Sequence, residues 1–331
     1  MALVELANKL ELDKDLSPQG RDVEYKGRIK QVFSAYSHNL SKMVLTNLLV
    51  MICAIPLIAL FFFYLPKLEK AAIAGMNFSG GLGIGYGVAD DTIAGTVAIY
   101  ATRQKMVLYA LTPCILLIGL GVSGAYYCCR NALWGAKLNV FRTFFRGVAK
   151  SWWKFLISFA VLGLLATSFS WTVLEMMKGY ASAGSANAGL WVGVIVNGLV
   201  IVAVCLFLMM FHPLVANYRF SYKATIKNAI ILGLIMGPIG LIILVVMGLP
   251  MGLMFAGNFK WFAYVFLLLF GGSLYIILNE AFGQYVSDNF IQMLLVQKER
   301  EEIKEREKAM KQANKQKKQK ASANYKKGKR R

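Results

Sequence analysis

Six long apolar stretches, separated by short polar segments, dominate the pattern of this chain. They cover Val44–Tyr64, Val107–Cys129, Phe155–Met177, Gly189–Phe211, Ala229–Ala256 and Trp261–Phe282. Each has about the ~20 residues that a helix rising ~1.5 Å per residue needs to cross a ~30 Å hydrocarbon layer. Backbone groups inside lipid must bond to one another, so each stretch is predicted to be helical. The pattern therefore predicts an all-α, polytopic membrane bundle of six transmembrane helices.

Composition agrees with a membrane protein. Of the 331 residues, 57% are hydrophobic and 16% are charged. A soluble core of this size would not require uninterrupted apolar runs of about 20 residues. The five cysteines lie in or at the ends of the apolar stretches and form no CxxC pair. We expect them to be packing residues, not metal ligands or disulfides.

Positive charge alternates from heavy to light between successive polar segments. Segments 1–43, 130–154, 212–228 and the C-terminal tail hold 31 of the 37 Lys and Arg residues. The intervening segments hold the other 6. Because Lys and Arg concentrate on the cytoplasmic side, both termini are predicted to be cytoplasmic. We expect a multi-pass protein of the cell (inner or plasma) membrane.

The same pattern divides the chain into three parts. Residues 1–42 are a cytoplasmic N-terminal segment, 43–295 the six-helix membrane domain, and 296–331 a basic cytoplasmic tail. Acidic and basic residues mix at helical spacings over 298–311, which predicts a helix, whereas 312–331 carries only positive charge and is predicted to be disordered. The extracytoplasmic loop 65–105 is glycine-rich, and Asp90 or Asp91 is placed to cap a helix that begins near Thr92.

Two cytoplasmic segments have amphipathic patterns. In 130–154, four cations recur every four residues and so share one face of a helix: Arg142, Arg146, Lys150 and Lys154. The opposite face carries Phe141, Phe144, Phe145, Val148 and Trp152. Segment 212–228 repeats the spacing with Arg219, Lys223 and Lys227. Two interpretations stay open, an anchor lying in the interface of an anionic bilayer and a binding platform for a cytoplasmic partner.

Polar side chains at membrane depth are costly, and they are the usual candidates for function. The intramembrane candidates are Asn47, Arg130, Asn197 and Glu280. Arg130 and Glu280 lie near span ends, so we expect water and headgroups at the interface to solvate them. Asn47 and Asn197 lie deeper and are predicted to hydrogen-bond between helices. Four prolines, one or two in each of three stretches, are able to kink their helices: Pro56, Pro113, Pro238 and Pro250.

Catalytic chemistry is not indicated. The chain has two histidines, no HExxH or GxSxG motif, and no close pair of carboxylates within a span. We therefore predict no catalytic residues, no metal site and no cofactor.

Three short motifs follow a known pattern. The first comprises Asn39, Leu40, Lys42, Asn47, Leu48, Leu49 and Pro56. The second runs through Gly121, Gly124, Ala125, Tyr126 and Arg130 to Phe141–Phe145 and Lys154. The third comprises Pro213, Leu214, Val215, Tyr218, Lys223 and Lys227–Ala229. Over most of 30–290 the chain resembles the YesL-like family of bacterial integral membrane proteins, whose function is unknown.

The resemblance implies a bacterial inner-membrane protein without known catalytic residues. Some members of that family are encoded beside carbohydrate-uptake systems, which implies an accessory role in sugar transport. The first hypothesis is therefore a non-enzymatic accessory component of a transport or cell-envelope complex, with a permease or similar complex as partner.

Two alternatives remain open. A small-solute transporter or channel is suggested by the kinked fifth stretch and by the repeated basic segment. A ribosome-tethered membrane-insertion factor is suggested by the basic tail, which would attract RNA or the ribosome as a non-specific polyanion. Sequence-specific nucleic-acid binding is not indicated, because no base-reading module accompanies the charge.

Overall fold

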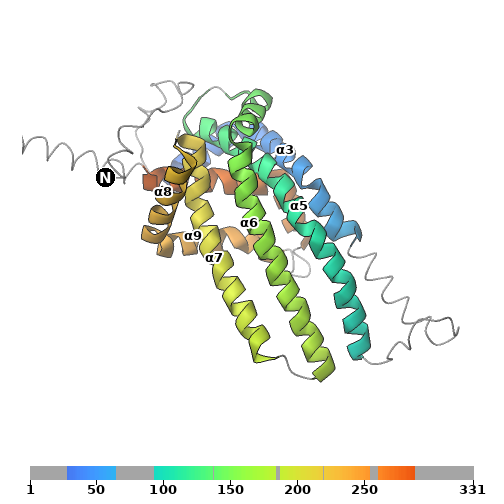
Figure 1. Cartoon of the computed structure of the whole chain (residues 1–331). Coiled ribbons are helices and arrows are strands. Elements are labelled where there is room, and N and C mark those ends of the chain that lie inside the picture. Colours follow the sequence, from blue (N-terminus) through green and yellow to red (C-terminus); the bar gives the residue numbers. More distant parts are fainter. Residues whose placement is uncertain are drawn as a thin grey trace, which may run out of the picture. The chain divides into compact units, whose positions relative to one another are not determined.

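A computed structural model describes residues 28–64, 93–136, 138–183, 187–218, 220–253 and 260–287 (Figure 1). Their regular elements are all helical: α2 (Arg28–His38), α3 (Leu40–Ala59), the π-helical turn η2 (Leu60–Tyr64), α5 (Ile93–Leu133), α6 (Val140–Ala183), α7 (Ala188–Asn217), α8 (Tyr222–Ile235), α9 (Gly237–Leu253), α10 (Lys260–Phe266), the π-helical turn η4 (Leu267–Gly271) and a helix over 272–287. The predictions for 1–27, most of the glycine-rich loop, Arg219 and the tail 296–331 fall outside the described residues.

Among the described residues, five helices are long and apolar enough to cross a membrane. They are α3, Val107–Leu133 of α5, Val140–Tyr180 of α6, α7, and Tyr264–Ser287 at the end of the described chain. A sixth crossing is present if α8 and α9 together form one span, since only the pair passes the same test. The all-α architecture is therefore confirmed, and the helices are compatible with a multi-pass membrane bundle.

The fifth predicted span is broken, not merely kinked. Its two halves, α8 and α9, meet at Met236 and are bent by 88°. Pro238 supplies no backbone N–H and disfavours helical geometry at the residue before it. The neighbouring Gly237 adds backbone freedom. Packing does not require a glycine there, because a Cβ would meet nothing within 4 Å. Pro238 was thus one of four predicted kink positions, whereas Pro56 and Pro113 lie inside the helices α3 and α5. The size of the bend was not predicted.

The helices α3, α5, α6 and α7 are packed side by side in this order (Figure 1). Two glycines allow close packing of α5 against α6 near the end where α5 stops and α6 begins. A Cβ on Gly124 would lie 2.7 Å from the ring of Phe144, and one on Gly147 would lie 2.8 Å from Tyr127. Each aromatic ring therefore occupies the space that the opposing glycine leaves open.

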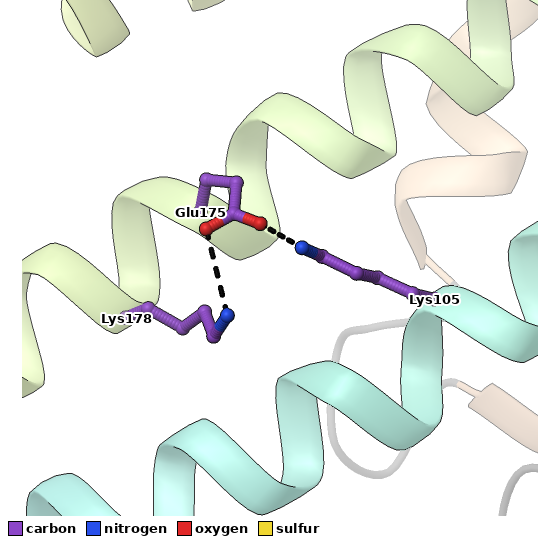
Figure 2. A network of polar contacts seen from close by, with 3 residues as sticks. All are labelled: Lys105, Glu175 and Lys178. Carbon is purple, nitrogen blue, oxygen red and sulfur yellow. Dashed lines mark hydrogen bonds and ion pairs between the residues drawn. The ribbon is translucent and has the colours of Figure 1, made fainter.

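The opposite end of the same helix pair is joined by charges. Lys105 of α5 pairs with Glu175 of α6, and Lys178 lies 3.6 Å from the second oxygen of Glu175 (Figure 2). The Lys105 ammonium also lies 4.5 Å from the centroid of the Trp171 ring. These side chains are partly exposed, so the pair contributes at most about 1 kcal/mol. Lys105 lies within the described part of helix α5, and the predicted helix start near Thr92 with its cap at Asp90 or Asp91 falls outside the described residues.

We predict that Gly124→Ala destabilises the protein by about 1–3 kcal/mol, because the added methyl group overlaps the Phe144 ring. The matched control is Gly248→Ala in α9, where a Cβ meets nothing within 4 Å. That change should be neutral or stabilising by up to about 1 kcal/mol, as expected for alanine replacing glycine in a helix. Thermal unfolding of both variants in detergent measures the difference, and equal shifts would contradict the proposed packing.

Candidate functional site: a buried polar cluster

Seven polar side chains from four helices meet near the end where α5 stops and α6 begins, which we call the basic end. This polar cluster consists of Tyr126, Arg130, Ser158, His212, Asn217, Asn279 and Glu280, and all seven are buried. Glu280 has 0% of its surface exposed and Arg130 has 3%. The expectation that interfacial water and headgroups solvate Arg130 and Glu280 was therefore wrong.

Hydrogen bonds within the cluster run between helices. The Asn217 amide of α7 donates to a Glu280 carboxylate oxygen at 2.6 Å, and the Asn279 amide donates to the Tyr126 hydroxyl. Ser158 of α6 and His212 of α7 are hydrogen-bonded at 2.9 Å. The cluster thus links α5, α6, α7 and the helix 272–287 through side chains that would be costly to bury alone.

Arg130 is held by the chain on two sides. Its Nη1 donates to the carbonyl of Ala216 at 2.7 Å, and its guanidinium lies 4.6 Å from the centroid of the Tyr127 ring. It also donates to the side-chain oxygen of Asn131 at 3.3 Å. Ala216 lies in the last turn of α7, where carbonyls lack helical partners and the helix end is electronegative. Arg130 therefore caps α7 from α5 and does not extend to the surface.

His212 is packed among aromatic rings. The Phe155 ring is stacked on it with centroids 4.6 Å apart, and Phe159 and Tyr126 lie within 5.6 Å. With one ring nitrogen bonded to Ser158, the imidazole has the surroundings of a structural contact between helices. Neighbouring cysteines are likewise packing residues, as predicted, since Cys128 and Cys129 are buried free thiols.

Three oxygen acceptors of the cluster have no hydrogen-bond donor among the described residues. They are Oδ1 of Asn217, Oδ1 of Asn279 and Oε2 of Glu280. Buried polar atoms are normally satisfied, and an exception marks either strain or a group that binds something further. The cluster thus combines a cation, a carboxyl group and spare acceptors. Among the described residues, no three His, Cys, Asp or Glu side chains are placed together as ligands for a metal.

Asn47 makes a separate buried contact, between α3 and the π-helical turn η4. Its amide nitrogen donates to the carbonyls of Leu267 and Leu268, and its oxygen accepts from the Ser273 backbone N–H at 3.0 Å. A π-helical turn disrupts the regular backbone pairing, which a polar side chain from a neighbouring helix restores. A Cβ on Gly272 would lie 2.6 Å from the Asn47 oxygen, so glycine is required there. The predicted interhelical role of Asn47 is confirmed.

Asn197 lies in a more open position. It accepts a hydrogen bond from Ser168 of α6 at 3.3 Å and donates to the carbonyl of Gly193 in its own helix at 3.0 Å. Its predicted interhelical bond is present, but it is exposed, unlike the bonds of Asn47.

The predicted basic residues separate into two environments. Arg142, Arg146 and Lys150 are exposed on α6, as are Lys223 and Lys227 on α8. Lys154 is only partly exposed, and its ammonium donates to the carbonyl of Phe220 at 3.4 Å. Of the expected apolar face, Phe144 is buried against α5, whereas Phe141, Phe145 and Trp152 are exposed. The basic segment is the first part of the continuous helix α6, not a separate amphipathic helix.

The described residues form an α-helical bundle with five or six long apolar helices, which is compatible with a multi-pass membrane protein. No family model, no curated protein and no solved structure matches the chain. Function must therefore be argued from the geometry of the residues.

We predict that Asn217 and Glu280 are energetically coupled. Asn217→Ala and Glu280→Ala should each destabilise the protein, and the double variant should cost less than their sum by about 0.5–1.5 kcal/mol, the usual net contribution of an intramolecular hydrogen bond. Unfolding in mixed detergent measures all three variants. Strict additivity would contradict the contact.

We predict that Asn47→Ala costs more stability than Asn197→Ala. Loss of Asn47 leaves two carbonyls and one N–H without their partner, at roughly 1–3 kcal/mol for each buried group. Loss of Asn197 removes one exposed interhelical bond, worth about 0.6 kcal/mol on average in membrane proteins. The same unfolding assay ranks the two, and equal losses would rule out a special role for the Asn47 contact.

Proposed function

We propose that this chain is a non-enzymatic multi-pass protein of the cell membrane that acts as an accessory component of a transport or cell-envelope complex. In this proposal the basic end and both termini face the cytoplasm. The alternating Lys and Arg content of the polar segments supports that orientation. The YesL-like resemblance supports the accessory role and points to carbohydrate uptake as one setting.

The observation that carries the proposal is the length of α6. Its 44 residues extend over roughly 66 Å at ~1.5 Å per residue, about twice the ~30 Å hydrocarbon core. The apolar part starts at Phe155, so the preceding fifteen positions, 140–154, continue the same helix for about 22 Å beyond it. A helix continuous with a transmembrane span is suited to reach a partner beyond the lipid headgroups.

The surface of this extension favours a protein partner. Phe141 and Phe145 are 53% and 61% exposed, and Arg142 and Arg146 lie exposed beside them. Aromatic residues and arginine are enriched among the residues that contribute most to protein interfaces. We call Phe141, Arg142, Phe145 and Arg146 the α6 contact face.

The α6 contact face is held in place by packing on the other side of α6. Phe144 and Gly147, on the other side of the same turns, pack against Gly124 and Tyr127 of α5. Arg130 and the polar cluster then fix α5 to α7. A preorganised surface loses less conformational entropy on binding than a flexible one, which supports a docking role for α6.

The two alternative functions receive less support from the described residues. In a transporter, Asn47 and Asn197 would be the polar groups lining a cavity near the middle of the membrane. Both are instead engaged in hydrogen bonds between helices. An insertion factor would use Arg130 as a charge in an open groove, and Arg130 is buried and bonded to Ala216. Its other support, the basic tail, lies outside the described residues.

We predict that a photocrosslinking amino acid at Phe145 captures one defined membrane-protein partner in intact cells, identified by mass spectrometry. The same label at Leu164, an α6 position that is also exposed but lies in the apolar part, should give no such product. Arg142→Ala with Arg146→Ala should abolish the Phe145 crosslink. Lys223→Ala with Lys227→Ala, which removes two exposed cations from α8, should leave it intact.

Two results would contradict the proposal. One is solute transport by proteoliposomes that contain this chain alone. The other is a crosslink that survives loss of both arginines, or that forms equally from Leu164.

A further inference from the structure

A small basic pocket lies between α5, α6 and the last turn of α7 with the residues that follow it. It has a volume of about 200 Å³ and is lined by Lys150 and Lys154 together with Tyr127, Asn217 and Tyr218. No acidic side chain is among its lining residues. Lys154 is held toward the pocket by its hydrogen bond to the Phe220 carbonyl. The pocket thus presents two cations with hydroxyl and amide groups, a set suited to a phosphate group.

An apolar groove lies along the same two helices, α6 and α7, further into their predicted spans. It encloses about 600 Å³ between α6, α7 and α8, and it is lined almost entirely by aliphatic and aromatic side chains. On α6 the lining residues progress from Lys150 and Lys154 in the pocket to Ile157 and Val161 in the groove. These positions recur at helical spacing and therefore share one face of α6.

On α6 and α7, the boundary between the two cavities coincides with the polar–apolar boundary of the sequence. The pocket residues of α6 precede Phe155, where the apolar stretch starts, and those at the end of α7 follow Phe211, where the preceding stretch ends. On α8 the groove begins earlier, since Tyr222 and Ile226 precede the apolar stretch. Along α7 the groove extends from Phe211 back to Val200, or about 16 Å of helix. That length is close to half of a ~30 Å hydrocarbon core, which is the depth of one leaflet.

From this arrangement we infer that the basic pocket and the apolar groove together form a binding site for one anionic phospholipid. Its phosphate lies between Lys150 and Lys154, and one acyl chain lies in the groove. A basic pocket directly above an apolar groove matches the charge and the hydrophobicity of such a lipid. The site is separate from the α6 contact face, so it does not depend on a protein partner.

The site is tested with the full-length protein in nanodiscs of phosphatidylglycerol and phosphatidylcholine in equal amounts, followed by native mass spectrometry of retained lipid. We expect phosphatidylglycerol to be retained in preference. Lys150→Gln with Lys154→Gln should reduce that preference about 10-fold or more, because the two ammonium groups in the pocket supply the charge-assisted hydrogen bonds to the phosphate. The matched pair Lys223→Gln with Lys227→Gln, exposed on α8 and outside both cavities, should change it far less.

A second comparison tests the groove. Val200→Trp fills the end of the groove and should lower retention of both lipids, whereas Leu199→Trp, on an exposed neighbour outside it, should not. Soluble glycerol phosphate should fail to displace the bound lipid, since it lacks the acyl chain. The inference is overturned if the wild-type protein shows no preference or if the two lysine pairs behave alike. Displacement by glycerol phosphate, with Val200→Trp without effect, would also overturn it and would assign the pocket to a free phosphate compound.

Discussion

The structure depends on one constraint: polar groups placed at membrane depth must find partners within the bundle. Burying an ionisable side chain in lipid costs several kcal/mol unless another group compensates it. Here a carboxyl group, a guanidinium, two amides, an imidazole and two hydroxyls are gathered in one cluster. Since their partners belong to four different helices, satisfying them fixes how those helices are arranged. The cluster thus acts as the framework on which the α6 contact face and the basic pocket are positioned.

The same constraint explains the irregular helices. Two π-helical turns and one sharp break interrupt spans that would otherwise be regular. At η4, Asn47 supplies the hydrogen bonds that the backbone lacks, and Gly272 allows α3 to approach closely enough. At Met236, the break is located just before Pro238, where a helix cannot continue its pairing. At η4 and at Met236, the irregularity is therefore found where a neighbouring side chain or a proline accounts for it.

Much of the fold was accessible from the sequence, because apolar length and proline position are local properties. The apolar spans and the bend in the fifth stretch both follow from runs of neighbouring residues. The helix ends were less accessible. The apolar stretch stops at Phe211, yet α7 continues to Asn217, because His212 and Asn217 find polar partners on other helices. A hydropathy pattern ends at the first polar residues and contains no information on distant partners.

For the same reason, only part of the candidate site could be predicted from the sequence. Arg130 and Glu280 were identified as polar residues near span ends, but their burial depends on Ala216 and Asn217, which are distant in sequence. Distance from a span end gives depth in the membrane, whereas the direction in which a side chain points depends on packing. The basic repeat of α6 shows the same difference between what sequence and packing determine. Its spacing places four cations on one face of the helix. Only Lys154 is partly buried, because it packs against the residues at the end of α7. Contacts between helices thus convert a uniform charged face into an exposed part suited to a partner and a recessed part suited to a phosphate group.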